Sequence, residues 1–315
     1  MRTVSGLAEI PPDLPTPVLA LGTFDGVHLG HQLVIGQAVE RARAVGGRAV
    51  VATFEPHPLE ILRPSTEPVL LTTLEERLRL FEPLGADVAL VLPFDVEFSR
   101  LPARTWLDDV LAGRLGAREI FVGTSYTFGH RREGTASGLA EWGRARGLPV
   151  HLVPAVLVSG EPVSSSRIRG ALREGLVDEA APLLGRWYSV GGRVIRGSGR
   201  GRTLGFPTAN IRTHPRKVLP GRGVYATVVT VRDRRYRGAT NIGYRPTFGG
   251  ATFAVEAHLL EFDGDLVGED VALAFVGRIR DERAFSGPEA LVRQIQDDVA
   301  RVRELIAAVG PSIIQ

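Results

Sequence analysis

Apolar runs and helix-like spacings alternate along roughly the first half of the chain. Uninterrupted apolar runs predict buried strands, and they occur at residues 17–21, 48–54, 88–92 and 120–122, with 150–153 and 156–158 as a closing strand. Between them, apolar residues at helical spacing predict helices over 32–45, 74–84 and 103–115, the second with Thr73 and Glu76 as a capping box. This alternation predicts an α/β domain with a doubly wound, mostly parallel sheet and ligands at the strand ends.

The pattern changes between Leu176 and Tyr188. A short helix is predicted over 177–184, and from Val190 to about residue 277 apolar and polar residues alternate with a period of two, separated by turn residues. Antiparallel strands are therefore expected there. Apolar residues at helical spacing over 288–308 then predict a helix packed on those strands. The predicted domains are residues 1–184 and 185–315.

The link between the first predicted strand and the first helix has the composition of a phosphate-binding loop. Gly22, Gly26 and Gly30 permit sharp turns and a close approach to a ligand. His28 and His31 lie three residues apart, so both imidazoles lie on one face of the first helical turn. Helix N-termini attract anions. An ordinary turn with surface histidines is the alternative, but the combination of residues favours a nucleotide site.

Residues 22–31, GTFDGVHLGH, resemble the signature of the nucleotidyltransferase superfamily in the form typical of bacterial FAD synthetases. The resemblance implies that His28 and His31 stabilise charge on the bridging and leaving phosphates of ATP. It also implies an ATP site that includes the residues around them, Gly22, Phe24, Asp25 and Gly30.

A second segment with phosphate-binding character is SSSRIR at residues 164–169. Serines are good helix N-caps, but arginines in a first helical turn face the positive end of the dipole, which predicts that an anion compensates them. The segment resembles the second signature of the same superfamily. The resemblance implies that Ser164, Ser165 and Arg167 hold the triphosphate opposite the two histidines.

Two further loops of the first domain are candidates for a flavin site. Prolines on both sides of His57 stiffen the loop after the second strand. Residues 123–129, GTSYTFG, form a glycine-bounded loop whose two aromatics either make hydrophobic contacts or stack on a flat ring. The resemblance to FAD synthetases favours a flavin, with contacts from Phe54, His57, Pro58, Ser125 and Phe128. The family has Asn or Asp where Ser125 stands, and a hydroxyl has a shorter reach than an amide.

Residues 197–210, GSGRGRTLGFPTAN, contain more candidate binding residues than any other segment of the second domain. Alternating glycines expose backbone N–H groups that can hold phosphate without a lysine. A dinucleotide-binding turn does not fit, because no helical pattern and no βαβ unit follow. A glycine-rich hairpin is the other alternative, but it leaves Thr208 and Asn210 unexplained, whose oxygens suit Mg²⁺.

This segment is similar to the riboflavin kinase family, and further parts of that family's pattern follow at 223–226, 241–248 and 255–268. The resemblance implies a small six-stranded antiparallel barrel with Thr208 and Asn210 as ligands of Mg²⁺. It assigns to the ATP site of this domain Gly197, Gly199, Gly201, Arg202, Gly205, Pro207 and Asn241. Glu256 and His258 share one face of a strand; composition alone favours a solvated face, whereas the resemblance implies that Glu256 is the catalytic base.

Composition limits the partners, the chemistry and the location that we expect for the protein. The 315 residues suffice for two cores, and a net charge of +3 without a long block of like charges leads us to expect no nucleic-acid partner. The absence of cysteine excludes disulfides and thiolate chemistry, and a single lysine, Lys217, excludes G-K-[ST] phosphate loops. No apolar run is long enough to span a membrane and no signal peptide is recognisable, so the expected location is the cytoplasm.

Together the two resemblances predict a member of the bacterial bifunctional riboflavin kinase and FAD synthetase family. Such an enzyme would convert riboflavin to FMN and FMN to FAD, using ATP and Mg²⁺. Two alternatives stay open, a kinase with a silent first domain, suggested by Ser125, and a non-enzymatic flavin-binding regulator. A nucleotidyltransferase acting on a pyridine nucleotide or phosphopantetheine fits the first domain but leaves the second without a purpose.

Overall fold

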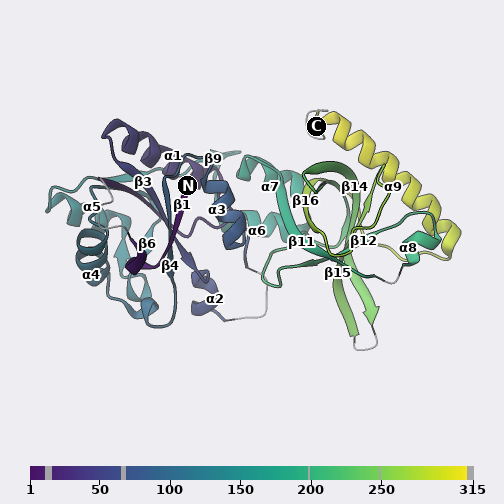
Figure 1. The fold of residues 1–315 in the computed structure, drawn as a ribbon, viewed down its shortest axis with the longest axis horizontal. Coiled ribbons are helices and arrows are strands. Elements are labelled where there is room, and N and C mark those ends of the chain that lie inside the picture. Colours follow the sequence, from purple (N-terminus) through teal and green to yellow (C-terminus); the bar gives the residue numbers. More distant parts are fainter. Residues whose placement is uncertain (11–15, 65–68, 198, 248–249, 311–315) are drawn as a thin grey trace. The chain divides into compact units, whose positions relative to one another are not determined.

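The computed structural model describes residues 1–10, 16–64, 69–197, 199–247 and 250–310 (Figure 1). For residue 200 and for residues 244–247 and 250–252 it describes the backbone alone. Ser198 and Phe248, which belong to the kinase-like segments of the sequence, lie outside the described residues. The chain divides into two compact units, residues 1–165 and 166–315.

The first unit is an α/β domain (Figure 1). Its elements are, in chain order, β1 (Arg2–Ser5), η1 (Leu7–Glu9), β2 (Pro17–Leu21), α1 (Leu29–Ala44), β3 (Arg48–Glu55), α2 (Pro58–Leu62), α3 (Leu74–Phe81), β4 (Val88–Pro93), η2 (Phe98–Arg100), α4 (Ala103–Thr105), η3 (Trp106–Arg114), β5 (Glu119–Gly123), β6 (Thr127–Phe128), η4 (His130–Arg132), β7 (Gly134–Thr135), α5 (Ala136–Arg144), β8 (Val150–Val153), β9 (Leu157–Val158) and β10 (Glu161–Pro162).

Six of these strands form one sheet in the order β1-β4-β3-β2-β5-β8, and every neighbouring pair is parallel. Helices α1 and α3 pack on one face, and η3 and α5 pack on the other. The doubly wound, parallel sheet predicted from the sequence is thereby confirmed. The strand order reverses at β2, which pairs with β3 on one side and β5 on the other. Ligands bind at such a switch point, beside the carboxyl ends of the strands.

The central strand β2 is buried along its whole length. Because successive side chains of a strand point to opposite faces, Val18 and Ala20 join the core under α1, whereas Leu19 and Leu21 join the core under η3. A strand covered on both faces needs an unbroken apolar run. This is why the runs in the sequence locate the strands of the sheet well.

Several elements differ from the sequence-based expectation. Helix α1 begins at Leu29 and not at Gln32, because His28 caps it. The helix predicted over 103–115 is a turn of α-helix, α4, that continues as a π-helix, η3. The segment at 156–158 does not extend the sheet, since β9 pairs with β10 in a hairpin that turns through Ser159 and Gly160 at positive φ. The sequence pattern predicts neither β1, which buries only one side chain, nor α5.

The second unit is a closed antiparallel barrel with accompanying helices (Figure 1). The strands follow one another around the barrel in the order β11-β12-β15-β14-β13-β16, which confirms the predicted six-stranded barrel. Its elements are α6 (Ser165–Glu174), which starts at the division between the units, α7 (Val177–Leu184), β11 (Tyr188–Ile195), α8 (Arg200–Thr203), β12 (Ala209–Thr213), β13 (Gly223–Val231), β14 (Arg234–Thr247), β15 (Gly250–Leu259), β16 (Asp270–Arg280) and α9 (Pro288–Ala308).

Two helices pack against this barrel within the second unit. Helix α7 contacts β11 and β16, so it groups with the barrel by contact; the domain boundary between residues 184 and 185 stays a prediction. Helix α9 has the bounds that the sequence predicts, and Val302 and Ile306 on its buried face pack on Ala226 and Val228 of β13. Within the described residues no helix, α9 included, combines the length and apolar character needed to cross a bilayer.

An ion pair between the exposed Arg41 of α1 and the buried Glu119 joins this helix to the sheet. The side chain of Glu119, at the start of β5, is 7% exposed and accepts two hydrogen bonds from Arg41 Nε, at 2.8 and 2.9 Å. Its second oxygen lies 2.9 Å from Nε2 of His151 on β8. These contacts, above all the hydrogen bond from Arg41, hold the pKa of Glu119 below its ordinary value. The ionised carboxylate therefore stabilises the folded first unit.

Replacing Glu119 by Gln should reduce stability in a pH-dependent way. Because the folded pKa of Glu119 lies below the ordinary value of 4.5, its stabilisation is present above that pH and is lost as the pH falls through the folded pKa. Urea denaturation should therefore show a larger difference between wild type and Glu119→Gln at pH 7 than at pH 4. Glu40→Gln, on an exposed position of α1, is the matched control. A difference independent of pH would contradict the argument.

Candidate active sites

The two histidines of the loop between β2 and α1 lie in contact. His28 is the N-cap of α1, and its Nδ1 accepts a hydrogen bond from the backbone N–H of His31 at 3.3 Å. The two imidazole rings stack with centroids 3.6 Å apart and planes inclined by 19°. Because Nδ1 of His28 is an acceptor, its ring proton is on Nε2 in the neutral form. The structure thus brings the predicted pair together at a helix N-terminus.

Phe24 supports this pair from within the protein. Its ring meets His31 edge-on at 5.3 Å and Phe81 of α3 at 5.8 Å. A Cβ at Gly22 would lie 3.0 Å from the Phe24 ring, and a Cβ at Gly30 would lie 3.2 Å from the imidazole of His28. A side chain at either position would therefore crowd a ring that builds the loop, independently of any ligand.

The backbone of the loop is strained at two residues. Phe24 and Val27 have φ values of 50° and 41°, a region that side chains with a Cβ rarely adopt and a β-branched residue least of all. The strained turn is closed by the N–H of Val27, which donates to the carbonyl of Phe24 at 3.0 Å. Gln32 donates from Nε2 to the Val27 carbonyl at 2.8 Å. Strain of this kind persists only where the surroundings fix the conformation.

Asp25 supplies the strongest of these constraints. Its carboxylate is fully buried and accepts hydrogen bonds from the backbone N–H groups of Leu71 and Thr72 at 3.0 and 2.9 Å. The Thr72 hydroxyl donates to the same carboxylate at 3.1 Å and accepts from the N–H of Gly26 at 2.9 Å. The carbonyl of Asp25 accepts the hydroxyl of Ser165 at 2.9 Å. Asp25 therefore anchors the loop to the segment before α3 and to Ser165, the last residue of the first unit.

His57 joins the same network. It is 4% exposed, caps α2 by accepting from the N–H of Leu59 at 3.0 Å, and thus carries its proton on Nε2 in the neutral form. That nitrogen lies 3.9 Å from a carboxylate oxygen of Asp25. Pro58 follows at the first helical position, where proline is preferred. Asp25 thereby links the loop of the two histidines to the loop of His57.

The predicted flavin contacts divide into buried and exposed positions. The Phe54 ring lies 5.7 Å from that of Phe94 and 5.8 Å from that of Phe98, inside the core under η3. Phe128 stacks on Tyr126 at 5.6 Å in the same core, where burial raises the pKa of the Tyr126 phenol far above its ordinary value. Ser125, by contrast, is exposed just beyond β5. Phe54 and Phe128 thus lie in one hydrophobic core.

The second phosphate-binding segment lies at the start of α6. Ser164 and Ser165 precede and begin the helix, and both are half-buried. Arg167 is half-buried in the first turn. Of these residues, Ser165 is tied to the histidine loop through the carbonyl of Asp25.

The candidate residues of the second unit lie on the outer face of the barrel. Ala226 packs against α9, and residues directly opposite each other in an antiparallel pair share a face. Asn241 is two residues from Ala239, the partner of Ala226, so it faces outward too. Its neighbours in the adjoining strands are Glu256 and, beyond it, Asn210. Asn210, Glu256 and Asn241 thus form a row across β12, β15 and β14.

The glycine-rich loop folds over Asn210 at one end of this row. A Cβ at Gly197 would lie 1.9 Å from the amide nitrogen of Asn210, and one at Gly201 would lie 2.3 Å from the carbonyl of Phe206. The loop contains the short helix α8, which the sequence pattern does not predict, between glycines 199 and 205, both at positive φ. Arg202 in this helix and Pro207 after it are exposed. Glycine is needed here because the loop and Asn210 are closely packed.

The oxygens at Thr208 and Asn210 fit a hard cation such as Mg²⁺. Oδ1 of Asn210 is buried and accepts no hydrogen bond from any described residue, an unfavourable state for a buried acceptor. The Thr208 hydroxyl lies 3.1 Å from where a Cβ of Gly201 would be, so the loop packs on it too. Hydroxyl and amide oxygens are suitable ligands. Three or more His, Asp or Glu side chains do not cluster as a metal site anywhere in the described ranges.

Sequence reasoning missed Arg77 and Thr53, which support the first site, and the contact that His258 makes in the second. The Nδ1 of His258 lies 2.8 Å from the carbonyl of Pro207, and its ring meets Phe206 edge-on, so His258 holds the turn before Thr208. Arg77 and Thr53 are fully buried beneath the first site. Arg77 could have been found, because it lies at the helical spacing of the apolar residues of α3, where a charge is unexpected.

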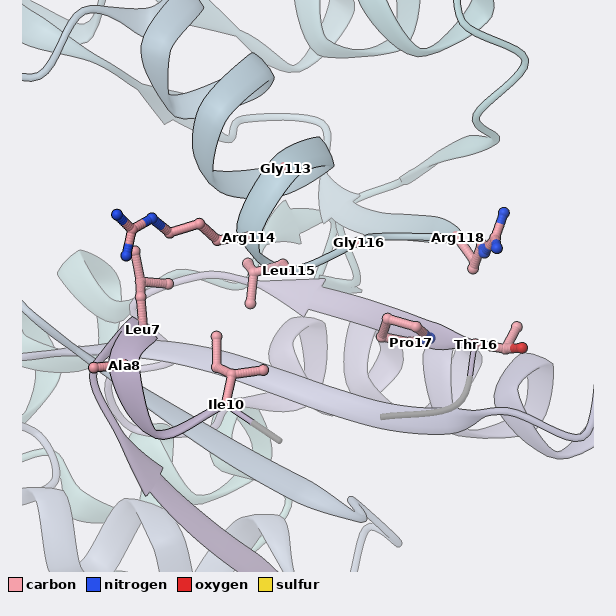
Figure 2. A pocket seen from close by; sticks show the side chains of 10 residues that line it. All are labelled: Leu7, Ala8, Ile10, Thr16, Pro17, Gly113, Arg114, Leu115, Gly116 and Arg118. Carbon is pink, nitrogen blue, oxygen red and sulfur yellow. The ribbon is translucent and has the colours of Figure 1, made fainter. Parts of the chain in front are cut away.

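A cavity of about 540 Å³ lies elsewhere in the first unit (Figure 2). It is bounded by η1, the start of β2 and the segment that follows η3, with Arg114 and Arg118 at its rim. Pro17, which lines it, begins β2, whereas the histidine loop follows the end of that strand. The cavity is therefore at the opposite edge of the sheet from the candidate site.

The two units correspond to two known domain types. Residues 10–167 match the family model of FAD synthetase, and residues 184–306 match that of riboflavin kinase. The chain is thus a two-domain flavin transferase by fold and motif. It belongs to the family of bifunctional riboflavin kinase/FMN adenylyltransferases.

Similar proteins support this assignment over nearly the whole chain. The bifunctional riboflavin kinase/FMN adenylyltransferase of Listeria monocytogenes is 37% identical over 92% of both chains. The one from Pseudomonas fluorescens is 37% identical over 98% of both, and the one from Escherichia coli K12 is 34% identical over 99% of both. A crystal structure described as a macrolide-efflux protein from Streptococcus pneumoniae has a TM-score of 0.86 and 32% identity, covering 96% of this chain and 99% of that one.

Replacing Asp25 by Asn should destabilise the first unit. The amide keeps the shape but loses the charge that accepts several hydrogen bonds, and it turns an N–H₂ group towards buried donors. We expect a loss on the order of 2–3 kcal/mol in the free energy of unfolding. Urea denaturation followed by tryptophan fluorescence measures it, with the exposed Asp109→Asn as control. Equal midpoints for the two variants would show that Asp25 does not hold the loop.

Proposed function

We propose that the chain makes FAD in two steps, each in its own domain. The second domain phosphorylates riboflavin to FMN with ATP, and the first transfers AMP from a second ATP to FMN, releasing pyrophosphate. The observation that carries this proposal is the presence, in one chain, of a stacked histidine pair at the switch point of the sheet and of an Asn–Glu–Asn row on the barrel. Each lies in the domain whose family performs the corresponding reaction.

In the first domain we propose an electrostatic mechanism without a protein nucleophile. An oxygen of the FMN phosphate forms a bond to the α-phosphorus of ATP, and the bond to the bridging oxygen of pyrophosphate breaks. His28 and His31 stabilise the charge on the bridging and leaving phosphates. Arg167, with Ser164 and Ser165, holds the triphosphate. Gly22, Phe24, Asp25 and Gly30 shape the ATP side of the site, and Phe54, His57, Pro58, Ser125 and Phe128 form the flavin side.

In the second domain we propose that Glu256 acts as general base. It accepts the proton of the terminal ribityl hydroxyl of riboflavin as that oxygen bonds to the γ-phosphorus and ADP leaves. Thr208 and Asn210 would hold Mg²⁺, which supplies charge neutralisation for the phosphates when bound. The remaining contacts to ATP come from the glycine loop and the adjoining strand, namely Gly197, Gly199, Gly201, Arg202, Gly205, Pro207 and Asn241.

A kinase with a silent first domain and a non-enzymatic flavin-binding regulator are both less well supported than an enzyme with two activities. A silent first domain is not favoured, because the match to the FAD synthetase model covers residues 10–167 and the paired histidines are in place. A non-enzymatic regulator would have no use for the row of Asn210, Glu256 and Asn241.

We further propose riboflavin, FMN and ATP as the binding partners, without nucleic acid or membrane. The ATP requirement supports a location in the cytoplasm.

A time course with purified protein, riboflavin, ATP and Mg²⁺ tests the order of the two steps. If FMN is the product of one domain and the substrate of the other, chromatography should show FMN rising first and then giving way to FAD. FMN that accumulates without FAD would reject the adenylyltransferase and leave the kinase. Ser125→Asn would then be the next protein to assay.

Single substitutions should separate the two activities. Glu256→Gln removes the proposed base, so FMN formation from riboflavin should fall at least about 100-fold, whereas FAD formation from supplied FMN should persist. His28→Ala should have the opposite effect, because its imidazole is proposed to act on the adenylyl transfer alone. Each variant is the control for the other. Loss of both activities in either folded variant would contradict two separate sites.

A further inference from the structure

A buried arginine connects the two substrate loops of the first unit. The side chain of Arg77, on α3, is fully buried, and its Nη1 donates to the carbonyl of Thr23 at 3.1 Å and to the carbonyl of Phe54 at 3.0 Å. Thr23 belongs to the histidine loop after β2, whereas Phe54 lies at the end of β3, just before the loop of His57. One nitrogen atom thus bridges the ends of two neighbouring strands at the edge of the sheet where the site lies.

Thr53 completes this bridge. Its hydroxyl is fully buried, accepts from Nη1 of Arg77 at 2.7 Å and donates to the Thr23 carbonyl at 2.8 Å. The carbonyl of Thr23 is therefore within hydrogen-bond distance of both side chains, and the two hydrogens of Nη1 are shared among its three acceptors. The hydroxyl and the guanidinium form a closed triangle of hydrogen bonds with that carbonyl, which leaves the histidine loop little freedom to shift relative to β3.

Burial makes the charged form of the Arg77 guanidinium energetically unfavourable. Burial lowers the pKa of its guanidinium, while the carboxylates of Asp25, Glu55 and Glu60 act in the opposite direction. Glu55 lies 3.6 Å from Nη2. Within the described part of the chain neither Nη2 nor Nε of Arg77 donates a hydrogen bond. A buried cation with unused donors is a poor way to stabilise a fold, because an apolar side chain of similar volume often does as well or better.

We propose that Arg77 and Thr53 are positioning residues for adenylyl transfer, which hold the nucleotide loop of His28 and His31 at a fixed distance from the flavin loop of His57. This inference rests on the proposed function of the first domain. The two substrates of that reaction meet between these loops, and a displacement of about 1 Å between reacting groups can lower a rate about 100-fold. The clamp acts on the relative position of the substrates and touches neither of them.

The sharpest test compares Thr53→Val with Thr53→Ser. Valine keeps the volume and the burial but removes the hydroxyl, whereas serine keeps the hydroxyl. We expect kcat for FAD formation from supplied FMN to fall about 10- to 100-fold in Thr53→Val and to stay within about twofold of wild type in Thr53→Ser. Because each loop keeps its own contacts, the Kd of ATP and of FMN, measured by calorimetry, should change by less than about threefold. The kinase activity of the second domain should be unchanged in both.

The outcomes separate the inference from the proposed function. Wild-type protein that makes no FAD from FMN would reject the proposed function. Active wild type with an equally active Thr53→Val, or with equal losses in the valine and serine variants, would overturn the clamp. A loss explained by weaker ATP or FMN binding alone would also overturn it.

A second variant keeps the test decisive if Thr53→Val does not fold. Arg77→Lys preserves the positive charge beside Asp25, but an ammonium at the end of a flexible stem does not reproduce the planar fork of a guanidinium. We expect a folded protein with wild-type kinase activity and a kcat for adenylyl transfer lowered about 10-fold or more. Unchanged adenylyl transfer in folded Arg77→Lys would overturn the proposal.

Discussion

The buried carboxylate of Asp25 is the interaction on which the first site depends. The loop after β2 contains two L-residues, Phe24 and Val27, in the left-handed region, and such a loop does not hold its own shape. Asp25 fixes it by accepting backbone N–H groups from the segment before α3. A buried anion in turn needs compensating contacts nearby; the guanidinium of Arg77 interacts with it electrostatically, and Nε2 of His57 lies 3.9 Å from its carboxylate. The strained loop and the buried charge are therefore linked, because the carboxylate that fixes the loop is itself buried close to the Arg77 guanidinium.

In the barrel, the side chains of the candidate site are aligned in a different way. Asn210, Glu256 and Asn241 come from three strands, and the hydrogen-bond register of a closed barrel sets their alignment. A shift of one residue in any strand would turn its side chain to the opposite face of the barrel. The row is held by the register of a barrel that closes on itself and has no free edge. The same chain thus builds one site from compensated strain and the other from strand register.

This difference explains what the sequence could predict. Strands buried on both faces, such as β2, and the helix α9 follow from apolar periodicity, which is a local property. The glycine and histidine motifs were found because their residues are adjacent in sequence. The role of Asp25 was not, because its partner Leu71 is 46 residues away. Arg77 lies 54 residues from Thr23, and strand β1 is recognisable only by its pairing with β4. Contacts across such separations leave no periodic signal.

The glycines of both motifs have a common physical reason that sequence reasoning had assigned to the ligand. Added Cβ atoms at Gly22 and Gly30 would crowd the rings of Phe24 and His28, and one at Gly197 would overlap the amide of Asn210. In each case the glycine makes room for a side chain of the candidate site. Close approach to a phosphate and close packing on a functional side chain require the same missing atom. Glycine spacing therefore identifies such a site in two unrelated folds, although it does not by itself tell which neighbour the glycine serves.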